Sequence, residues 1–263
     1  MRPTSSCRRR PRKPSKTYQY IRHTRRRLAK QSTCCYGRRF TLSSDKIVFI
    51  DLGLVEYAEA LKLQHELVDK RAVGKIRDTV LLLEHYDVYT LGRRGLEENI
   101  LNKSIPVFRV ERGGDATYHG PGQLVAYPIV SLSENKLGVA EFVSLLEKTC
   151  IALLAEFGVE GEHVDGKPGV WVKGRKIASI GLAVKNWVTY HGVAVNVNTD
   201  LSKFHGIKPC GMDPNIMTSM QQILGREVDM PAVKKAFIRC FTAAMGAAGC
   251  DVRHAVWGGA DRI

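Results

Sequence analysis

The chain has 263 residues, 44% of them hydrophobic, which is enough to form one large globular domain or two small ones. It carries 40 Lys and Arg against 26 Asp and Glu, a net charge of +14. Residues 1–46 hold 15 of these basic residues and a single acidic one, which leaves 25 of each sign in residues 47–263. A nucleic-acid footprint needs a net basic face, so the composition disfavours that function for the larger part of the chain.

The first 46 residues are a segment of a different kind. They are rich in Arg, contain Ser and Thr, and lack the apolar run that a secretory signal or a membrane span requires. This composition is typical of an organelle transit peptide, so we expect a disordered leader directed to the mitochondrion, with the plastid as the alternative. Runs of three Arg at 8–10 and 25–27 also fit a nucleic-acid-binding or nuclear-import tail. A second class of function, a basic-tailed binding or scaffold protein, therefore stays open.

Hydrophobic periodicity and turn residues predict the elements of residues 47–263. In chain order, they are a strand at 47–52, a helix at 55–73, strands at 79–84, 88–91, 107–110 and 122–130, a helix at 139–157, strands at 169–172, 176–185 and 188–197, a loop at 200–215, and helices at 218–224 and 231–248. The last three strands are rich in β-branched residues and alternate in polarity, which indicates adjacent antiparallel strands.

Strands and helices do not alternate regularly along this part of the chain. The order favours an α+β fold, a mostly antiparallel sheet flanked by a few long helices, over a doubly wound dinucleotide-binding sheet. No internal repeat or interdomain linker interrupts residues 47–263. We therefore expect these residues to form a single domain.

The most informative stretch is the glycine-rich segment at residues 112–123, Arg-Gly-Gly-Asp-Ala-Thr-Tyr-His-Gly-Pro-Gly-Gln. Glycines let amide N–H groups approach a ligand closely, and the Arg, Thr, Tyr and His side chains are able to orient a carbonyl group or carry a proton. The spacing matches neither common phosphate-binding glycine motif, and the segment runs into a strand instead of a helix. It predicts a ligand-facing loop anchored to the sheet, and on composition alone it also fits a structural hairpin.

Seven cysteines occur, at positions 7, 34, 35, 150, 210, 240 and 250, without a C-x-x-C pair or the Cys and His spacing of a zinc site. We expect no metal site, and reduced thiols as in a matrix or cytosolic compartment. Cys210 lies between Pro209 and Gly211, which predicts an exposed turn. Cys150, Cys240 and Cys250 lie in or beside apolar helical stretches, where a cysteine is more often inert.

A nucleophilic thiol at Cys210 needs a partner, because a free thiol is mostly protonated at neutral pH. Lys176 is one candidate, since it begins an apolar segment in which partial desolvation disfavours the ammonium form and makes the amine a better base. His119 and His191, each in a Tyr-His-Gly triplet, are further candidate bases, and they equally fit positioning donors or packed structure. The residues alone do not rank these three side chains.

Four ordered stretches together resemble the lipoyl(octanoyl) transferase family. They are the glycine-rich segment continued to residue 124, residues 169–172 with 175–181, the run His-Gly-Val-Ala-Val-Asn-Val at 191–197, and Pro-Cys-Gly at 209–211. The resemblance covers about residues 47–245, and the order and spacing of four motifs make coincidence improbable. It implies the catalytic domain fold shared by biotin protein ligases and lipoate-protein ligases. The family's bacterial members begin near residue 47, so the basic leader is an addition.

The resemblance also implies a reaction, the first step of protein lipoylation. An octanoyl group moves from the thiol of octanoyl-acyl carrier protein to an enzyme cysteine, and then to a lysine amine of a lipoyl domain. The match places the thioester at Cys210, with Lys176 activating the thiol and relaying protons. The implied acceptors are lipoyl domains of 2-oxoacid dehydrogenase complexes and the glycine cleavage H protein. No metal, dissociable cofactor, nucleic acid or membrane insertion is required.

The family's substrate-contacting segments map onto three stretches of this chain. They are Arg112, Gly113, Gly114, Asp115, Ala116, Thr117, Tyr118 and His119; Ser179, Ile180 and Gly181; and Gly192, Val193 and Ala194. Two enzymatic alternatives belong to the same superfamily, a protein-to-protein lipoyl or octanoyl amidotransferase and an ATP-dependent lipoate ligase. The first would use the same cysteine chemistry, whereas for the second we find no further phosphate-binding motif and no evident role for Cys210.

Overall fold

The computed structural model describes residues 46–209 and 213–255. Cys210 and all but the last residue of the predicted leader lie outside this described part of the chain. The predicted targeting role of residues 1–46 is therefore not addressed by the fold.

Within the described residues, ten strands form a seven-stranded sheet in the order β10-β1-β2-β6-β9-β8-β7 and a three-stranded sheet in the order β4-β3-β5. The large sheet contains β1 (Ile47–Val55), β2 (Thr79–His85), β6 (Gln123–Ile129), β7 (Val170–Val172), β8 (Arg175–Lys185), β9 (Val188–Asn196) and β10 (Cys250–His254). The small sheet contains β3 (Val88–Leu91), β4 (Val107–Arg109) and β5 (Ala116–His119). The helices are α2 (Tyr57–Ala72), α3 (Val139–Glu156), α4 (Met220–Leu224) and α5 (Met230–Ala244), with short 3-10 turns at Glu97–Asn99, Leu201–Gly206 and Pro214–Ile216.

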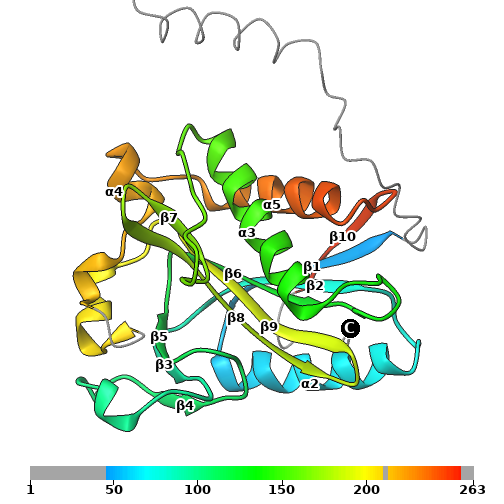
Figure 1. Cartoon of the computed structure of the whole chain (residues 1–263), viewed down its shortest axis with the longest axis horizontal. Coiled ribbons are helices and arrows are strands. Elements are labelled where there is room, and N and C mark those ends of the chain that lie inside the picture. The colour runs from blue at the N-terminus through cyan, green and yellow to red at the C-terminus, as the bar shows by residue number, and fades with distance from the viewer. Residues whose placement is uncertain (1–45, 210–212, 256–263) are drawn as a thin grey trace, which may run out of the picture. The chain divides into compact units, whose positions relative to one another are not determined.

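Helices cover both faces of the large sheet. Figure 1 shows α3 and α5 side by side on one face and α2 on the other. Strand β1 has apolar side chains on both faces. Ile47 and Phe49 join the apolar cluster beneath α3 and α5, while Val48 and Ile50 join the cluster beneath α2. Because successive side chains of a strand point to opposite faces, a strand buried on both sides reads as a continuous apolar run.

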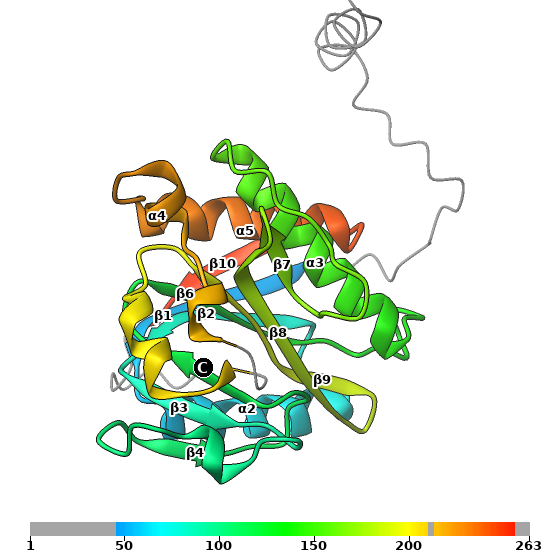
Figure 2. The same ribbon diagram turned by 60° about the vertical axis from the view of Figure 1, so that its left-hand side comes forward.

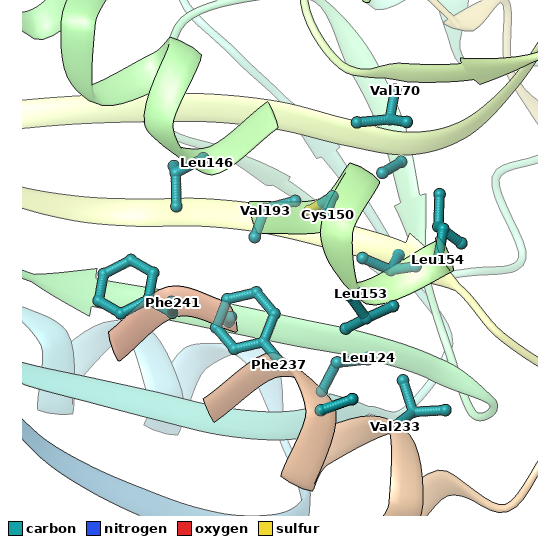
Figure 3. Packing of buried hydrophobic residues seen from close by; sticks show 14 of the residues in the cluster. Leu124, Leu146, Cys150, Leu153, Leu154, Val170, Val193, Val233, Phe237 and Phe241 are labelled. Atoms are coloured by element: carbon teal, nitrogen blue, oxygen red, sulfur yellow. The ribbon is translucent and has the colours of Figure 1, made fainter. Parts of the chain in front are cut away.

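The cluster beneath α3 and α5 is the larger one and is closed by aromatic rings. Phe237 and Phe241 reach from α5 toward the side of α3 that carries Leu146 and Cys150 (Figure 3). Phe241 packs edge-on against Phe49 with ring centroids 6.0 Å apart. Cys150 is fully buried there, and burial raises the pKa of its thiol far above the ordinary value, as expected for an inert cysteine.

The small sheet packs against the beginning of α2, as Figure 2 shows for β3 and β4. The contact is an apolar cluster of Tyr57 from α2 with Val88 and Val110. The glycine-rich segment leaves this small sheet and crosses to the large one, where the Gly113 N–H donates a hydrogen bond to the carbonyl oxygen of Leu182 at 2.9 Å. The two sheets are therefore joined at that segment.

The predicted fold class is confirmed, and the predicted order of strands and helices is found with shifts of a few residues at most ends. Strands β7, β8 and β9 are antiparallel neighbours, as expected. The sheet is more mixed than predicted, because β1 pairs in parallel with both β2 and β10. No helix in the described ranges has both the length and the apolar content needed to cross a membrane.

Two strands were missed by the sequence prediction. The predicted last helix was expected to run to 248, but α5 ends at Ala244 and Gly246, at a φ of +64°, opens a turn that leads into β10. Charged residues interrupt the apolar pattern of β10, as is common in edge strands. Strand β5 lies inside the glycine-rich segment. Its four residues are too few, among so many glycines, to show a clear alternation of polar and apolar side chains.

Phe241→Ala is expected to lower the free energy of unfolding by about 3–5 kcal/mol, because it leaves a cavity where a fully buried ring contacted other aromatic rings. Urea denaturation followed by circular dichroism measures the change. The matched control is Val139→Ala at the exposed start of α3, for which a change within about 0.5 kcal/mol is expected. Equal losses in both variants would contradict the described core.

Candidate active site

One pocket brings together most of the residues that the sequence assigned to substrate binding. Its walls are the glycine-rich segment, β8 and β9, and every predicted substrate-binding residue lines it except Tyr118. Lys176, the candidate base, also lines the pocket, as does Pro209, the chain neighbour of Cys210. Segments distant in the sequence thus meet at one cavity.

The pairing of β8 with β9 explains why two of the three predicted stretches are adjacent. Ser179 lies opposite Ala194, and Gly181 lies opposite Gly192. Neither glycine position has room for a side chain. A Cβ on Gly181 would lie 3.0 Å from the carbonyl oxygen of Gly113, and one on Gly192 would lie 2.2 Å from that of Ala126. The glycines therefore permit the close approach that shapes this wall.

Arg112 holds the glycine-rich segment in place. Its side chain is buried and donates hydrogen bonds to both the hydroxyl and the carbonyl oxygen of Thr90 on β3, at 2.7 and 2.8 Å from Nη2. Nη1 donates to the carbonyl oxygen of Gly113 at 3.1 Å. The guanidinium charge is also felt inside the pocket, where it lowers the pKa values of His119 and His191.

Tyr118 was predicted to contact substrate, but its side chain lies on the other side of β5. Its hydroxyl donates a 2.7 Å hydrogen bond to the Asp87 carboxylate, and its ring packs edge-on against Phe204. Side chains of a strand alternate between faces, so Thr117 and His119 face the pocket and Tyr118 faces the small-sheet core. The motif marks a segment that lines the pocket, but it does not indicate this alternation.

His119 and His191 are both neutral at physiological pH. Burial is the main cause, and it lowers the pKa of each ring to about 3. For His119 the tautomer follows from its neighbour. Gln123 donates its amide hydrogens to the oxygens of Tyr118 and Asn196, so its own oxygen accepts a 2.7 Å hydrogen bond from Nδ1 of His119. Nε2 of His119 is left as an acceptor.

His191 is held in an unusual backbone conformation, with a φ of +53° inside β9. The buried side chain of Gln64, from α2, supports it by accepting the His191 backbone N–H at 2.7 Å. The ring lies over Tyr190 and lines the pocket, and its Nε2 is 3.7 Å from the carboxylate of Glu111. Neither Gln64 nor Glu111 belonged to a motif, so no local pattern singled them out.

Lys176 is buried, with 8% of its surface exposed, which agrees with the desolvation expected from its apolar segment. Its ammonium nitrogen lies 5.5 Å from the centroid of the Trp171 ring. Its backbone oxygen accepts a hydrogen bond from Thr218 N–H at 2.9 Å, which ties β8 to the chain that follows residues 210–212. Tyr57, Val125, Tyr127 and Met217 also line the pocket, although only their apolar character was visible in the sequence.

The part of the chain that forms this pocket is also the part that matches known proteins. The family described as the Lipoyl protein ligase A/B catalytic domain matches residues 56–242. An octanoyltransferase of Syntrophotalea carbinolica is 49% identical over 191 residues, covering 73% of this chain and 90% of that protein. An octanoyltransferase of Pelobacter propionicus is 45% identical over 188 residues, covering 72% and 90%. This chain belongs to the lipoyl protein ligase A/B catalytic domain family.

Solved structures of other proteins show the same fold. Lipoate-protein ligase A bound with ATP gives a TM-score of 0.62 at 14% identity, over 82% of this chain and 90% of that one. A bi-partite lipoate protein ligase from Thermoplasma acidophilum gives 0.61 at 14% identity, over 81% and 89%. These likenesses confirm the predicted lipoate-ligase-like architecture. Within the described residues, no group of three or more His, Cys, Asp or Glu side chains is placed to hold a metal ion.

Acidification from pH 7.5 to 5 is expected to lower the melting temperature. His85, His119 and His191 are buried with lowered pKa values, of about 4, 3 and 3, so below about pH 6.5 the unfolded chain binds protons that the folded chain does not. Their stabilisation is complete above that pH and is lost as the pH falls. His163, exposed and with a pKa raised by Asp165 and Glu147, acts in the opposite direction.

Scanning calorimetry at several pH values measures this dependence. His119→Gln should weaken it, because the variant lacks one of the buried imidazoles. A melting temperature that is constant or rises between pH 7.5 and 5 would show that these imidazoles are not buried in neutral form.

Proposed function

We propose that this protein transfers an octanoyl group from acyl carrier protein, through a thioester on Cys210, to the lysine amine of a lipoyl domain. The observation that carries the proposal is the single pocket at which Lys176, the glycine-rich segment and Pro209 meet. The relatives named octanoyltransferase support the same reaction, since they match over most of their own length.

The first half-reaction uses the lysine as a base and then as an acid. The amine of Lys176 takes the proton of the Cys210 thiol, and the thiolate attacks the carbonyl carbon of the octanoyl thioester. A carbon–sulfur bond to Cys210 forms and the bond to the carrier sulfur breaks. The Lys176 ammonium then returns its proton to the departing carrier thiolate. Alignment in the pocket supplies most of the acceleration, because thioesters exchange readily with thiolates.

The second half-reaction runs the same relay toward a different nucleophile. The amine of the acceptor lysine attacks the thioester carbonyl, and Lys176 accepts a proton from the nitrogen as the amide forms. The sulfur of Cys210 leaves and is protonated by the same ammonium. The backbone amides of the glycine-rich segment are candidates for stabilising the oxyanion of both tetrahedral intermediates.

The chemistry of the pocket walls suits an uncharged acyl chain. Ile180, Val193 and Val125 offer apolar surface, and each methylene group that they bury contributes about 0.8 kcal/mol. His119 and His191 are neutral, so they place no ionic charge against the chain. The acceptors that we propose are the lipoyl domains of 2-oxoacid dehydrogenase complexes and the glycine cleavage H protein. The mitochondrion is the proposed location, supported by the composition of residues 1–46.

Incubation with octanoyl-acyl carrier protein is expected to add the mass of one octanoyl group, observed by intact mass spectrometry and removed by hydroxylamine. Cys210→Ala should abolish the adduct. Lys176→Ala should slow both half-reactions by about 10²–10⁴, the range typical of a lost general acid and base.

Two matched variants control for indirect effects. Cys240→Ala removes a partly buried thiol whose pKa is raised to about 11, chiefly by burial, and should retain the adduct. Lys173→Ala removes an exposed lysine from the turn between β7 and β8 and should retain normal rates. An adduct that persists in Cys210→Ala and disappears in Cys240→Ala would refute the assignment. Free octanoate with ATP as the effective donor would favour a ligase instead.

Fusion of residues 1–46 to a fluorescent protein is expected to direct it to mitochondria, because the segment is basic and almost free of acids. Microscopy with organelle markers measures the location. A control fusion in which the six Arg of 8–10 and 25–27 are replaced by Gln should stay in the cytosol. Plastid or nuclear accumulation of the unaltered fusion would contradict the proposed destination.

A further inference from the structure

Trp171 and Lys176 face each other across two paired strands. They are register partners in the antiparallel pair of β7 and β8, next to a bulge at Val170. The Nζ atom of Lys176 lies 5.5 Å from the centroid of the Trp171 ring. This is within the distance of about 6 Å at which the face of an indole attracts a cation, and a neutral amine feels no such attraction.

The ring of Trp171 is fixed from several directions. Its Nε1 donates to the carbonyl oxygen of Lys167 at 3.1 Å, and its backbone exchanges two hydrogen bonds of 2.9 and 2.8 Å with Glu162. Only 1% of its surface is exposed. The face of the indole is therefore presented to Lys176 as a rigid surface.

The stem of Lys176 is held as tightly as the ring. Gly169 has a φ of +119°, and a Cβ there would lie 2.8 Å from Cε of Lys176 and 2.3 Å from the carbonyl oxygen of Ala178. The Gly169 N–H donates to the buried carboxylate of Glu147 at 3.0 Å. The side chain of Lys176 thus packs against the backbone of Gly169, and its Nζ lies over the indole ring.

Groups of both charge signs lie around Lys176. Its burial disfavours the charged form. The ammonium nitrogen of Lys167 also lies 5.5 Å from the centroid of the Trp171 ring, and the guanidinium of Arg112 lies at the same pocket. The carboxylate of Asp115 and the imidazoles of His119 and His191 line that pocket, and behind Gly169 the Glu147 carboxylate pairs with His163.

We propose that Trp171 is a positioning residue that stabilises Lys176 in the steps of acyl transfer in which this lysine carries the proton. The inference rests on the proposed function, in which Lys176 receives the thiol proton and later delivers it to the departing thiolate. The indole stabilises the lysine once it carries the proton, so that the proton does not return to the nucleophilic sulfur. It also aims Nζ along one direction, which matters because proton transfer requires alignment.

Two measurements on the full chain test this inference. The first is the pH dependence with which an amine-reactive reagent labels Lys176, resolved by peptide mass spectrometry without acyl substrate, with Lys136 as an exposed internal reference. Trp171→Leu should lower the labelling midpoint of Lys176 by about one pH unit, and Trp171→Phe should lower it less, because a benzene ring attracts cations more weakly than an indole. Trp187→Leu, at the exposed tip of the β8–β9 hairpin, should not change it.

The second measurement is the pH–rate profile of octanoyl transfer by the same variants. In Trp171→Leu, the pH at which the rate falls on the basic side should decrease together with the labelling midpoint. In Trp171→Phe, this pH should lie closer to the value of the unaltered protein. A uniform loss of rate at every pH, with the midpoint unchanged, would reduce Trp171 to a packing residue and overturn the inference. If the unaltered protein transferred no octanoyl group while the midpoint still shifted, the proposed function would fail and the pairing of ring and lysine would stand.

Discussion

The site depends on one constraint, that three chain segments approach more closely than side chains would allow. Gly113 donates its N–H to Leu182, while Gly181 and Gly192 leave no Cβ to separate the glycine-rich segment, β8 and β6. This contact joins the small sheet to the large one and creates the pocket between them. Glycine is therefore required at positions 181 and 192 because the backbones pack closely. The same close packing gives the pocket its shape.

The electrostatic character of the pocket follows from the burial of Arg112, Lys176 and the two imidazoles. The two imidazoles are kept neutral by the loss of solvent, and Arg112 is committed to Thr90 and Gly113 through its hydrogen bonds. In the proposed reaction, Lys176 is the pocket residue that accepts and releases a proton. A pocket whose imidazoles are neutral, whose guanidinium is hydrogen-bonded to the protein and whose lysine can carry a proton suits the transfer of an uncharged acyl group.

Much of this arrangement could be predicted from the sequence, and the remainder has identifiable physical reasons. The glycine-rich segment, Lys176 and the β8–β9 pair were recognisable because their chemistry or periodicity is local. Strand β10 was missed because charged residues interrupt its pattern, and Tyr118 was placed in the pocket because a motif does not state which face of a strand a residue occupies. The support that Gln64 gives to His191 joins two elements far apart in the chain, and no local pattern predicts it.

A crystal structure of the protein carrying an octanoyl group would locate the acyl chain and its thioester. We expect the acyl chain to lie between the glycine-rich segment and β8–β9, with its thioester sulfur on Cys210 and Nζ of Lys176 within hydrogen-bond reach of that sulfur. An acyl group bound elsewhere, or a thioester sulfur separated from Lys176 by the width of the pocket, would contradict this expectation.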